Sequence, residues 1–407
     1  IMARKFISFL GTADYAEVFY ELNGEKSNKK IKFVQEAIIT LACKQFDIRT
    51  DKIIILLTEA AREKNWEKLK NSLVNSGIPE EMILSLDIPA EKGEAGVWRL
   101  FEKIYNDVLE HEDTVIFDIT NAFRFLPVVM YSVLRYAQYL KNVKLEGIYY
   151  GAYEQTENEV EPIINLTETY EIIEWAAAAN IFTSYGISSE LNKRIKKQNE
   201  DFSKTGHLSD AIVTMSRNIN FARGLRIMEG NIFQNCIEKI DTYKEDKSIN
   251  PALPPILDKV TKKIEKFKTN SVLNFIPALE WYIEHDMPAE ALSMMKEGIV
   301  SYLLVENNLN YKDSLLRLVF GQRLSYKGTS SFDYKKTRIE SKKEIIEEIM
   351  NQENTKELKS IIESFNSFRN DIDHCGFGEG ARNPENLQKE LKKAFEKIKT
   401  FFSEKIE

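Results

Sequence analysis

The chain is poor in the residues that supply covalent or metal-based stability. Its 407 residues include three cysteines, Cys43, Cys236 and Cys375, and no Cys-x-x-Cys pair. This spacing excludes a disulfide framework and offers no zinc-type ligand pattern. Four histidines are present, so the field of candidate general bases is small. The cysteine usage predicts a reducing compartment, and we expect a cytoplasmic protein without a metal site.

Long apolar runs are also missing. The longest, FLPVVM and WAAAANIF, fall far short of the roughly 20 residues that span a membrane, and the first residues show no cleavable signal pattern. We therefore expect no membrane partner. The formal net charge of −7 argues against broad binding to duplex DNA. With 43% hydrophobic and 29% charged residues, the composition is typical of a soluble protein with two or three domains.

The segment 1–165 alternates strand and helix patterns. Short runs rich in Ile, Val and aromatic residues predict strands at 5–11, 52–58, 82–88, 114–120 and 144–153. Amphipathic stretches between them predict helices over 62–73, 95–109 and 125–140. This alternation predicts an α/β, Rossmann-like domain with a mainly parallel sheet and helices on both faces. Ligands of such sheets bind at the carboxyl ends of the strands, near the point where the strand order reverses.

After residue 165 no strand pattern follows, and the rest of the chain reads as all-α. We divide it into a helical connector, 166–270, and a C-terminal helical domain, 271–407. The connector contains one helix-breaking stretch, rich in proline, at 248–258. In the C-terminal domain, helical patterns cover 271–304 (with a break at 285–291), 353–374 and 383–405, and the polar stretch 325–343 predicts a loop.

Small and polar residues follow four of the predicted strands. The candidate ligand-binding residues there are Gly11, Thr12, Asp14, Tyr15, Thr58, Glu59, Asp118, Thr120, Asn121, Phe123, Arg124, Tyr150 and Gly151. Hydroxyls and backbone amides suit phosphates, and aromatic rings suit bases. Each turn alone is better explained by helix capping, but four turns at one sheet edge favour a pocket. The chain has neither a G-x-G-x-x-G after its first strand nor a P-loop, which argues against a dinucleotide redox enzyme or a P-loop ATPase.

Three segments of the first half resemble a known family. FLGTADYAEVFYEL, VIFDITNAFRFLPVVM and IYYGAYE are similar to the CARF domains of CRISPR-associated ancillary proteins. The subgroup resembled here is named for an Asp-x-Thr-His-Gly motif, which stands in this chain as Asp118-Ile119-Thr120-Asn121-Ala122. Asn121 and Ala122 replace the His and Gly, which puts ring cleavage at this turn in doubt. ALEWYIEHDMPAEALSMMKEGIVSYLL and FRNDIDHCGF resemble the helices of a HEPN domain.

The resemblance implies a two-part function. CARF domains bind cyclic oligoadenylates made by type III CRISPR effector complexes, and HEPN domains cleave single-stranded RNA as dimers, without metal, through an Arg-x4–6-His motif. In this chain that motif reads Arg369, four residues, His374, with Asn370 beside the arginine. The implied protein is a cyclic oligoadenylate-activated endoribonuclease of antiviral defence, a homodimer or higher homo-oligomer. We favour cyclic tetra-adenylate over cyclic hexa-adenylate as its activator.

The chemistry of the motif fits these residue types. Metal-free cleavage uses the 2′-hydroxyl as nucleophile, so it needs a group that moves protons near neutral pH, His374, and a fixed cation, Arg369. Side chains five positions apart on a helix point about 140° away from each other, so Arg369 and His374 of one chain cannot both reach one phosphate. We therefore expect two copies of the chain, related by symmetry, to form the site together. On spacing alone, His374 is equally well explained as a solvated residue at a helix end. Glu297 is expected either to pair with Arg369 or to lie on a helix surface.

Two other functions stay open. One is a cyclic-nucleotide-sensing regulator without catalysis, and the other is a CARF domain that also degrades its own ligand. The remaining histidines, His111, His207 and His285, have no partner at catalytic or metal spacing in the sequence. We expect them to be structural or exposed.

Overall fold

The chain folds into two compact units, residues 1–171 and residues 172–407. The structure, a computed structural model, describes residues 3–43, 46–47, 49–88, 93–121, 125–197, 202–246, 249, 251–325, 340–377 and 381–406; for 202–206 and 406 it describes the backbone alone. Each unit has its own hydrophobic core. Within the described part of the chain, no helix combines the length and the apolar character needed to cross a membrane.

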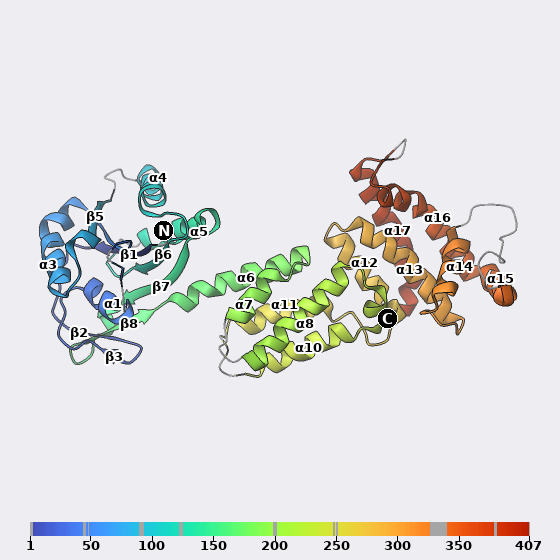
Figure 1. Cartoon of the computed structure of the whole chain (residues 1–407), viewed down its shortest axis with the longest axis horizontal. Helices are drawn as coiled ribbons and strands as arrows, with labels where there is room; N and C mark the ends of the chain where they lie inside the picture. Colours follow the sequence, from blue (N-terminus) through green and yellow to red (C-terminus); the bar gives the residue numbers. More distant parts are fainter. Residues whose placement is uncertain are drawn as a thin grey trace. The chain divides into compact units, whose positions relative to one another are not determined.

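The described residues of the first unit form an eight-stranded sheet with the order β3-β2-β8-β7-β6-β1-β4-β5 (Figure 1). Its strands are β1 (Arg4–Leu10), β2 (Phe19–Leu22), β3 (Glu25–Lys26), β4 (Lys52–Leu57), β5 (Ile83–Asp87), β6 (Thr114–Asp118), β7 (Lys144–Gly151) and β8 (Val160–Asn165). The pairs β7–β8 and β2–β3 are antiparallel, and all others are parallel. The strand order reverses between β1 and β6, the place where an open α/β sheet offers a ligand crevice.

Alternating side chains of the central strands pack into two separate cores, one on each face of the sheet. In β1, Phe6 packs on one face and Ile7 on the other, as the two-residue period of a strand requires. One face is covered by α1 (Val34–Ala42) and α3 (Glu67–Asn75), the other by α4 (Gly93–Lys103) and α5 (Leu126–Lys141). Shorter elements complete the unit: α2 (Glu59–Ala61) and the π-helical turns Arg62–Trp66 and Ile104–Val108. The predicted α/β domain with helices on both faces is confirmed.

All five strands predicted from the sequence are present. The pattern missed β2, β3 and β8, which extend the sheet on the side of β7. β3 has two residues and β2 has four, too few for an alternating pattern to show. β8 carries a buried carboxylate, Glu161, and a proline, Pro162, between its apolar residues, and both weaken a strand pattern.

The described residues of the second unit form helices and their connections, with no strand. Its elements are α7 (Ser189–Lys197), α8 (Phe202–Asn220), α9 (Gly224–Glu229), α10 (Asn231–Lys244), α11 (Leu253–Ile264), α12 (Phe275–Glu284), α13 (Pro288–Glu306), α14 (Ser314–Ser325), α15 (Lys343–Asn351), α16 (Glu353–Asp373) and α17 (Pro384–Ile406). The predicted break between α12 and α13 is confirmed, as are α16 and α17. The pattern did not resolve α14 and α15. Most of the predicted loop, 326–339, lies outside the described residues.

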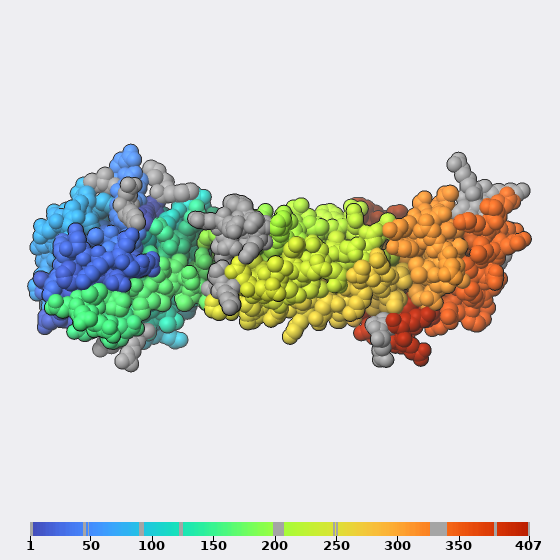
Figure 2. All heavy atoms as spheres, turned by 90° about the horizontal axis from the view of Figure 1, so that it is seen from below, coloured from blue at the N-terminus to red at the C-terminus, as the bar shows by residue number. Residues whose placement is uncertain are grey.

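One continuous core runs through the second unit, from Trp175 to Phe402. The phenol of Tyr282 on α12 donates a hydrogen bond of 2.7 Å to the carbonyl of Ile219 on α8, and Asn274 Nδ2 donates one of 2.9 Å to the carbonyl of Ile227 on α9. Figure 2 shows the two segments in direct contact, green to yellow against orange. The division at residue 270 stays a prediction from the sequence.

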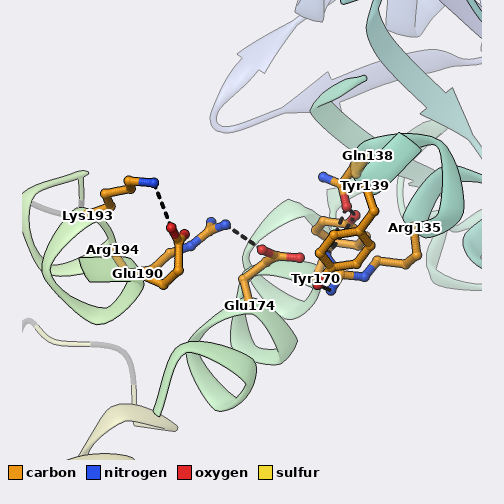
Figure 3. A network of polar contacts seen from close by, with 8 residues as sticks. All are labelled: Arg135, Gln138, Tyr139, Tyr170, Glu174, Glu190, Lys193 and Arg194. Carbon is orange, nitrogen blue, oxygen red and sulfur yellow. Dashed lines mark hydrogen bonds and ion pairs between the residues drawn. The ribbon is translucent and has the colours of Figure 1, made fainter. Parts of the chain in front are cut away.

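The helix α6 (Thr167–Tyr185) includes the boundary between the units and makes polar contacts within each of them. In the first unit, Tyr170 donates to Gln138 Oε1 of α5, and Arg135 donates to the same oxygen at 2.9 Å (Figure 3). In the second unit, Arg194 of α7 pairs with Glu174. The residues of α6 on each side of the boundary are thereby tied to their own unit.

Candidate functional site

The turn after β1 is held by hydrogen bonds rather than left open. The backbone N–H of Gly11 donates to the Tyr15 hydroxyl at 3.0 Å, and Asn65 Nδ2 donates to the carbonyls of Gly11 and Ala13, each at 3.0 Å. Burial raises the pKa of Tyr15 to about 12, so its phenol stays neutral. A Cβ on Gly11 would stand 2.8 Å from that hydroxyl, which explains the need for glycine.

Asp118, at the carboxyl end of β6, organises the neighbouring turn. It is fully buried, and Ser8 Oγ of β1 donates to its Oδ2 at 2.6 Å. Thr120 donates to Oδ1 twice, through its backbone N–H at 2.9 Å and its hydroxyl at 2.6 Å. Burial raises the pKa of Asp118 although these hydrogen bonds act to lower it. The carboxyl group therefore ties β1 to the turn after β6 across the reversal of the strand order.

Gly151 joins a third strand to this cluster. Its backbone N–H donates to Thr120 Oγ1 at 2.8 Å, which links the end of β7 to Asp118 through the threonine. An added Cβ on Gly151 would stand 2.6 Å from Val34 Cγ2 and 2.8 Å from Glu161 Oε1, so no side chain fits there. An added Cβ on Gly11 would stand 3.8 Å from that of Asn121, which brings the first two turns together.

We call this cluster the switch-point edge. Its members come from the carboxyl ends of β1, β6 and β7 and the turns that follow them: Gly11, Tyr15, Asp118, Thr120, Asn121 and Gly151. The edge holds two glycines and two hydroxyls, and the N–H groups of both glycines donate to those hydroxyls. Phosphate binding at this edge stays a prediction. Six of the thirteen candidate ligand residues thus lie in a linked cluster.

The remaining candidates have other surroundings. Thr58 caps α2, because its hydroxyl accepts a hydrogen bond of 3.3 Å from Ala61 N, and Glu59 is exposed in the first turn of that helix. Thr12 is exposed, and Asp14 is exposed and pairs with Lys64 at 3.0 Å. The remaining three are Tyr150, whose hydroxyl donates to Glu154 at 3.0 Å, and Phe123 and Arg124, which lie outside the described residues, as does Ala122 of the motif.

In the second unit, α16 carries the Arg-x4-His motif at its end. Buried Leu358, Ile362 and Phe365 anchor the helix in the core. The helix ends at His374, after which Cys375 (φ 52°) and Gly376 (φ 68°) take the left-handed conformation that turns the chain away. The motif side chains therefore sit where the helix leaves the core.

The motif residues are accessible. His374 and Asn370 are exposed, and the His374 N–H donates to the Asn370 carbonyl at 3.0 Å. Arg369, a quarter exposed, donates from Nε to Asp373 Oδ2 at 2.9 Å. We call Arg369, Asn370, Asp373 and His374 the α16 site. Within one chain its guanidinium is engaged by a carboxylate one turn along the helix rather than by the histidine.

A second cation lies beside Arg369. Lys296 of α13 is half-buried, and burial together with the charge of Arg369 lowers its pKa. The aliphatic side chain of Lys296 passes over Gly321 of α14: a Cβ added to Gly321 would stand 3.5 Å from Lys296 Cε. No local pattern around Arg369 pointed to Lys296, because Lys296 comes from another helix.

Glu297, the neighbour of Lys296, pairs with Arg317 and not with Arg369. Of the two expectations for Glu297, pairing with Arg369 is wrong. The pair borders a cavity of about 230 Å³ lined by Ala222, Gly224, Leu225, Met228, Ser293, Met294, Glu297, Ser301 and Arg317. Arg317 also donates to Ser301 Oγ at 2.6 Å and to the Tyr311 carbonyl at 3.0 Å, so the cavity's charged groups satisfy one another.

The other three histidines belong to other segments of the chain. His285 ends α12, with Nδ1 2.7 Å from the Trp281 carbonyl and Nε2 3.2 Å from the Thr183 carbonyl, and burial lowers its pKa. His111 and His207 are exposed. Among the described residues, no group of three His, Cys, Asp or Glu side chains is placed to hold a metal ion.

With the geometry in place, comparisons with known proteins assign the first unit. Residues 5–154 match the family model described as CRISPR system endoribonuclease Csx1, CARF domain. The first unit is a CARF domain. All members of its switch-point edge, from Gly11 to Gly151, lie inside the matched range. The chain is thus a CRISPR-associated protein that contains a CARF domain.

The region after the CARF domain matches a different model. Residues 171–272 match the second domain of CRISPR-associated protein MJ1674. That protein, from Methanocaldococcus jannaschii, is 31% identical to this chain over 172 residues, which is 42% of this chain and 26% of the relative. The chain therefore matches only about a quarter of the relative's length.

Sequence reasoning missed four buried polar residues that support the CARF edge: Ser8, Gln35, Asn65 and Glu161. Ser8 had a signal, since it is the one hydroxyl within the apolar run of β1. Gln35 Nε2 donates to the Phe9 carbonyl at 2.8 Å from the start of α1, a contact between distant segments that no local pattern announces. Glu161 was missed together with its strand.

Proposed function

We propose that this chain is a cytoplasmic endoribonuclease that cleaves single-stranded RNA without metal after its CARF domain binds a cyclic oligoadenylate in type III CRISPR defence. The observation that carries the first part is the CARF domain with its hydrogen-bonded switch-point edge. The observation that supports the second is the accessible pair of Arg369 and His374 at the end of α16.

The switch-point edge suits a ring of phosphodiesters. Gly11 and Gly151 let the turns of the edge pack closely, and Thr120 and Tyr15 carry hydroxyls that hydrogen bonds hold in place. A turn that is already held by hydrogen bonds loses little conformational entropy when a ligand binds, which favours affinity. The ring itself is proposed to be cyclic tetra-adenylate, with cyclic hexa-adenylate as the alternative.

In the proposed cleavage, His374 moves the proton of the 2′-hydroxyl as this oxygen attacks the adjacent phosphate. Arg369 stabilises the negative charge that develops on the phosphate oxygens. Asp373 now accepts from Arg369, so RNA binding requires the guanidinium to exchange a carboxylate for a phosphate. Lys296 adds a second positive charge next to that exchange.

A composite site made by two chains fits this geometry. Arg369 faces Asp373 within its own helix, and His374 lies in the first residue after the helix, so one chain offers an incomplete set. Phe377, 93% exposed, is a large apolar side chain three residues beyond His374, where a second copy is proposed to pack. A homodimer would supply two histidines and two arginines to one phosphate.

The test is cleavage of an end-labelled single-stranded RNA by the full chain in the presence of a chelator, with no activator, cyclic tetra-adenylate, cyclic hexa-adenylate or the linear oligomers. We expect cleavage with one ring and background without it. Ring binding with no cleavage under any condition would leave a nucleotide-sensing regulator. Conversion of the ring to linear products would identify a CARF domain that also degrades its ligand.

A further inference from the structure

Glu161 is a buried carboxyl group just behind the switch-point edge. It lies in β8 with 4% of its surface exposed, directly opposite Tyr20 of β2 in the strand register. Its Oε1 would stand 2.8 Å from a Cβ added to Gly151, so it packs against the backbone that donates to Thr120. The Glu161 carboxyl group is therefore a direct neighbour of Gly151.

The groups that act on the Glu161 carboxyl are acidic or phenolic. Asp118 of β6 and Glu154, in the turn after β7, place negative charge near it, and the phenol of Tyr20 hydrogen-bonds to it. The charge of Glu161 also contributes to raising the pKa of Tyr150 of β7. Burial, reinforced by Glu154 and Asp118, raises the pKa of Glu161 to about 7. Near neutral pH the side chain therefore exists in both protonation states.

The two states differ in what they offer an anionic ligand. Protonated, Glu161 is a neutral hydrogen-bonding group under Gly151. Ionised, it adds negative charge close to Asp118, at an edge with a low local dielectric where such charge acts strongly. Phosphodiesters stay ionised throughout the neutral range, so only the protein side of the interaction changes with pH.

We propose that Glu161 is a positioning residue of the switch-point edge: its protonated form holds the Gly151–Thr120 backbone for a phosphate-bearing ligand, and its ionised form opposes that ligand. This role rests on the proposed ligand-sensing function of the CARF domain. To that function it adds one residue, Glu161, and the pH range over which ligand affinity should change. By linkage, a ligand that prefers the protonated form must also promote proton uptake when it binds.

The test is the affinity of the full chain for cyclic tetra-adenylate and cyclic hexa-adenylate at about pH 6, 7 and 8, a range that brackets the titration. We expect the wild-type affinity to fall about tenfold from the lowest to the highest pH, the size of a typical coupling between two sites. Calorimetry in two buffers with different ionisation enthalpies should show net proton uptake near neutral pH.

Two variants separate the protonation of Glu161 from other titrations. Glu161→Gln keeps the shape of the neutral form, so its affinity should match that of the wild type at low pH and stay nearly constant as pH rises. Glu159→Gln is the matched control, because Glu159 is an exposed carboxylate next to the start of β8 that pairs with Lys30. It should keep the wild-type pH profile.

The outcomes are distinguishable from those of the proposed function. Binding of a ring with a flat wild-type pH profile, or with no proton uptake, overturns the role of Glu161 and leaves ligand sensing intact. A pH slope retained in Glu161→Gln overturns it as well. No binding of either ring at any pH overturns the sensing function. Because the wild-type profile and the proton uptake need no variant, poor folding of Glu161→Gln would not remove the test.

Discussion

At the switch-point edge of the CARF domain, polar groups are buried and joined by hydrogen bonds from three strands, whereas the α16 site exposes its histidine on a helix end and satisfies its arginine with a neighbouring carboxylate. The first arrangement is complete within one chain: Asp118 alone accepts three hydrogen bonds. The second is open, with contacts that water or a partner can replace. The contrast predicts that substitutions at the edge will change stability and that substitutions at the α16 site will change activity.

The largest expected effect is on RNA cleavage at the open site. His374→Ala should reduce ring-activated cleavage by at least about 100-fold, because it removes the proposed proton-transfer group. Its stability and ring affinity should stay unchanged, since the side chain is exposed. His207→Ala, at an exposed histidine of α8, is the control and should keep full activity. Equal activity of the two variants would exclude His374 from catalysis.

The next effect is on stability at the closed site. Asp118→Ala should lower the free energy of unfolding by about 2–4 kcal/mol, because it leaves the buried Ser8 donor and the half-buried Thr120 donors without an acceptor. Urea unfolding of the full chain measures this loss. Asp118→Asn keeps an acceptor oxygen and removes a charge that burial disfavours, so it should cost less than half as much. A small loss in both variants would show that the edge is not organised by this residue.

A smaller effect should appear as a pH dependence. The folded pKa of Glu161 is raised to about 7 from an ordinary value of 4.5, so the folded state binds this proton more tightly than the unfolded state does. Its contribution to stability is fully present below about pH 4.5 and is lost as the pH rises through about 7. The difference in unfolding free energy between wild type and Glu161→Gln should change by on the order of 1–3 kcal/mol across that range. A constant difference would contradict the raised pKa.

The smallest effect on stability is expected at the ion pair of the α16 site. Asp373→Asn should change the free energy of unfolding by no more than about 0.5 kcal/mol, the usual value of an exposed pair one helical turn apart. The same change frees Arg369, so RNA affinity should rise, measured in a His374→Ala background to prevent cleavage. Weaker RNA binding would indicate that Asp373 positions Arg369 rather than competing for it.

Much of the CARF domain could be predicted because its parallel strands are continuous apolar runs, such as those of β1 and β4. The strands that the sequence pattern did not predict were short or, like β8, contained a carboxylate and a proline. The switch-point edge was predictable at Asp118 and Thr120, since residues after parallel strands meet at one edge. The residues that support this edge were not predictable, because Asn65 and Glu161 contact it from segments far away in the sequence.

The end of α16 was predictable for a local reason: apolar spacing stops and a glycine follows, and the structure ends the helix there. The partner of Arg369 was harder to predict, because the sequence offers Asp371, Asp373 and Glu297 as carboxylates on α16 and α13. Packing decides among them. Glu297 is taken by Arg317 and Asp371 accepts from the backbone of Arg382 at 3.0 Å, which leaves Asp373 for Arg369.

Cys375 follows His374 directly and is exposed, while Cys43 and Cys236 are buried with pKa values raised to about 12. A thiol-reactive fluorophore added to the unaltered polypeptide should thus attach at a single place, one residue from the histidine. Such a dye would serve as a built-in reporter: a shift in its emission on mixing with oligonucleotide, or energy transfer between differently coloured batches, would reveal what approaches that helix end in real time.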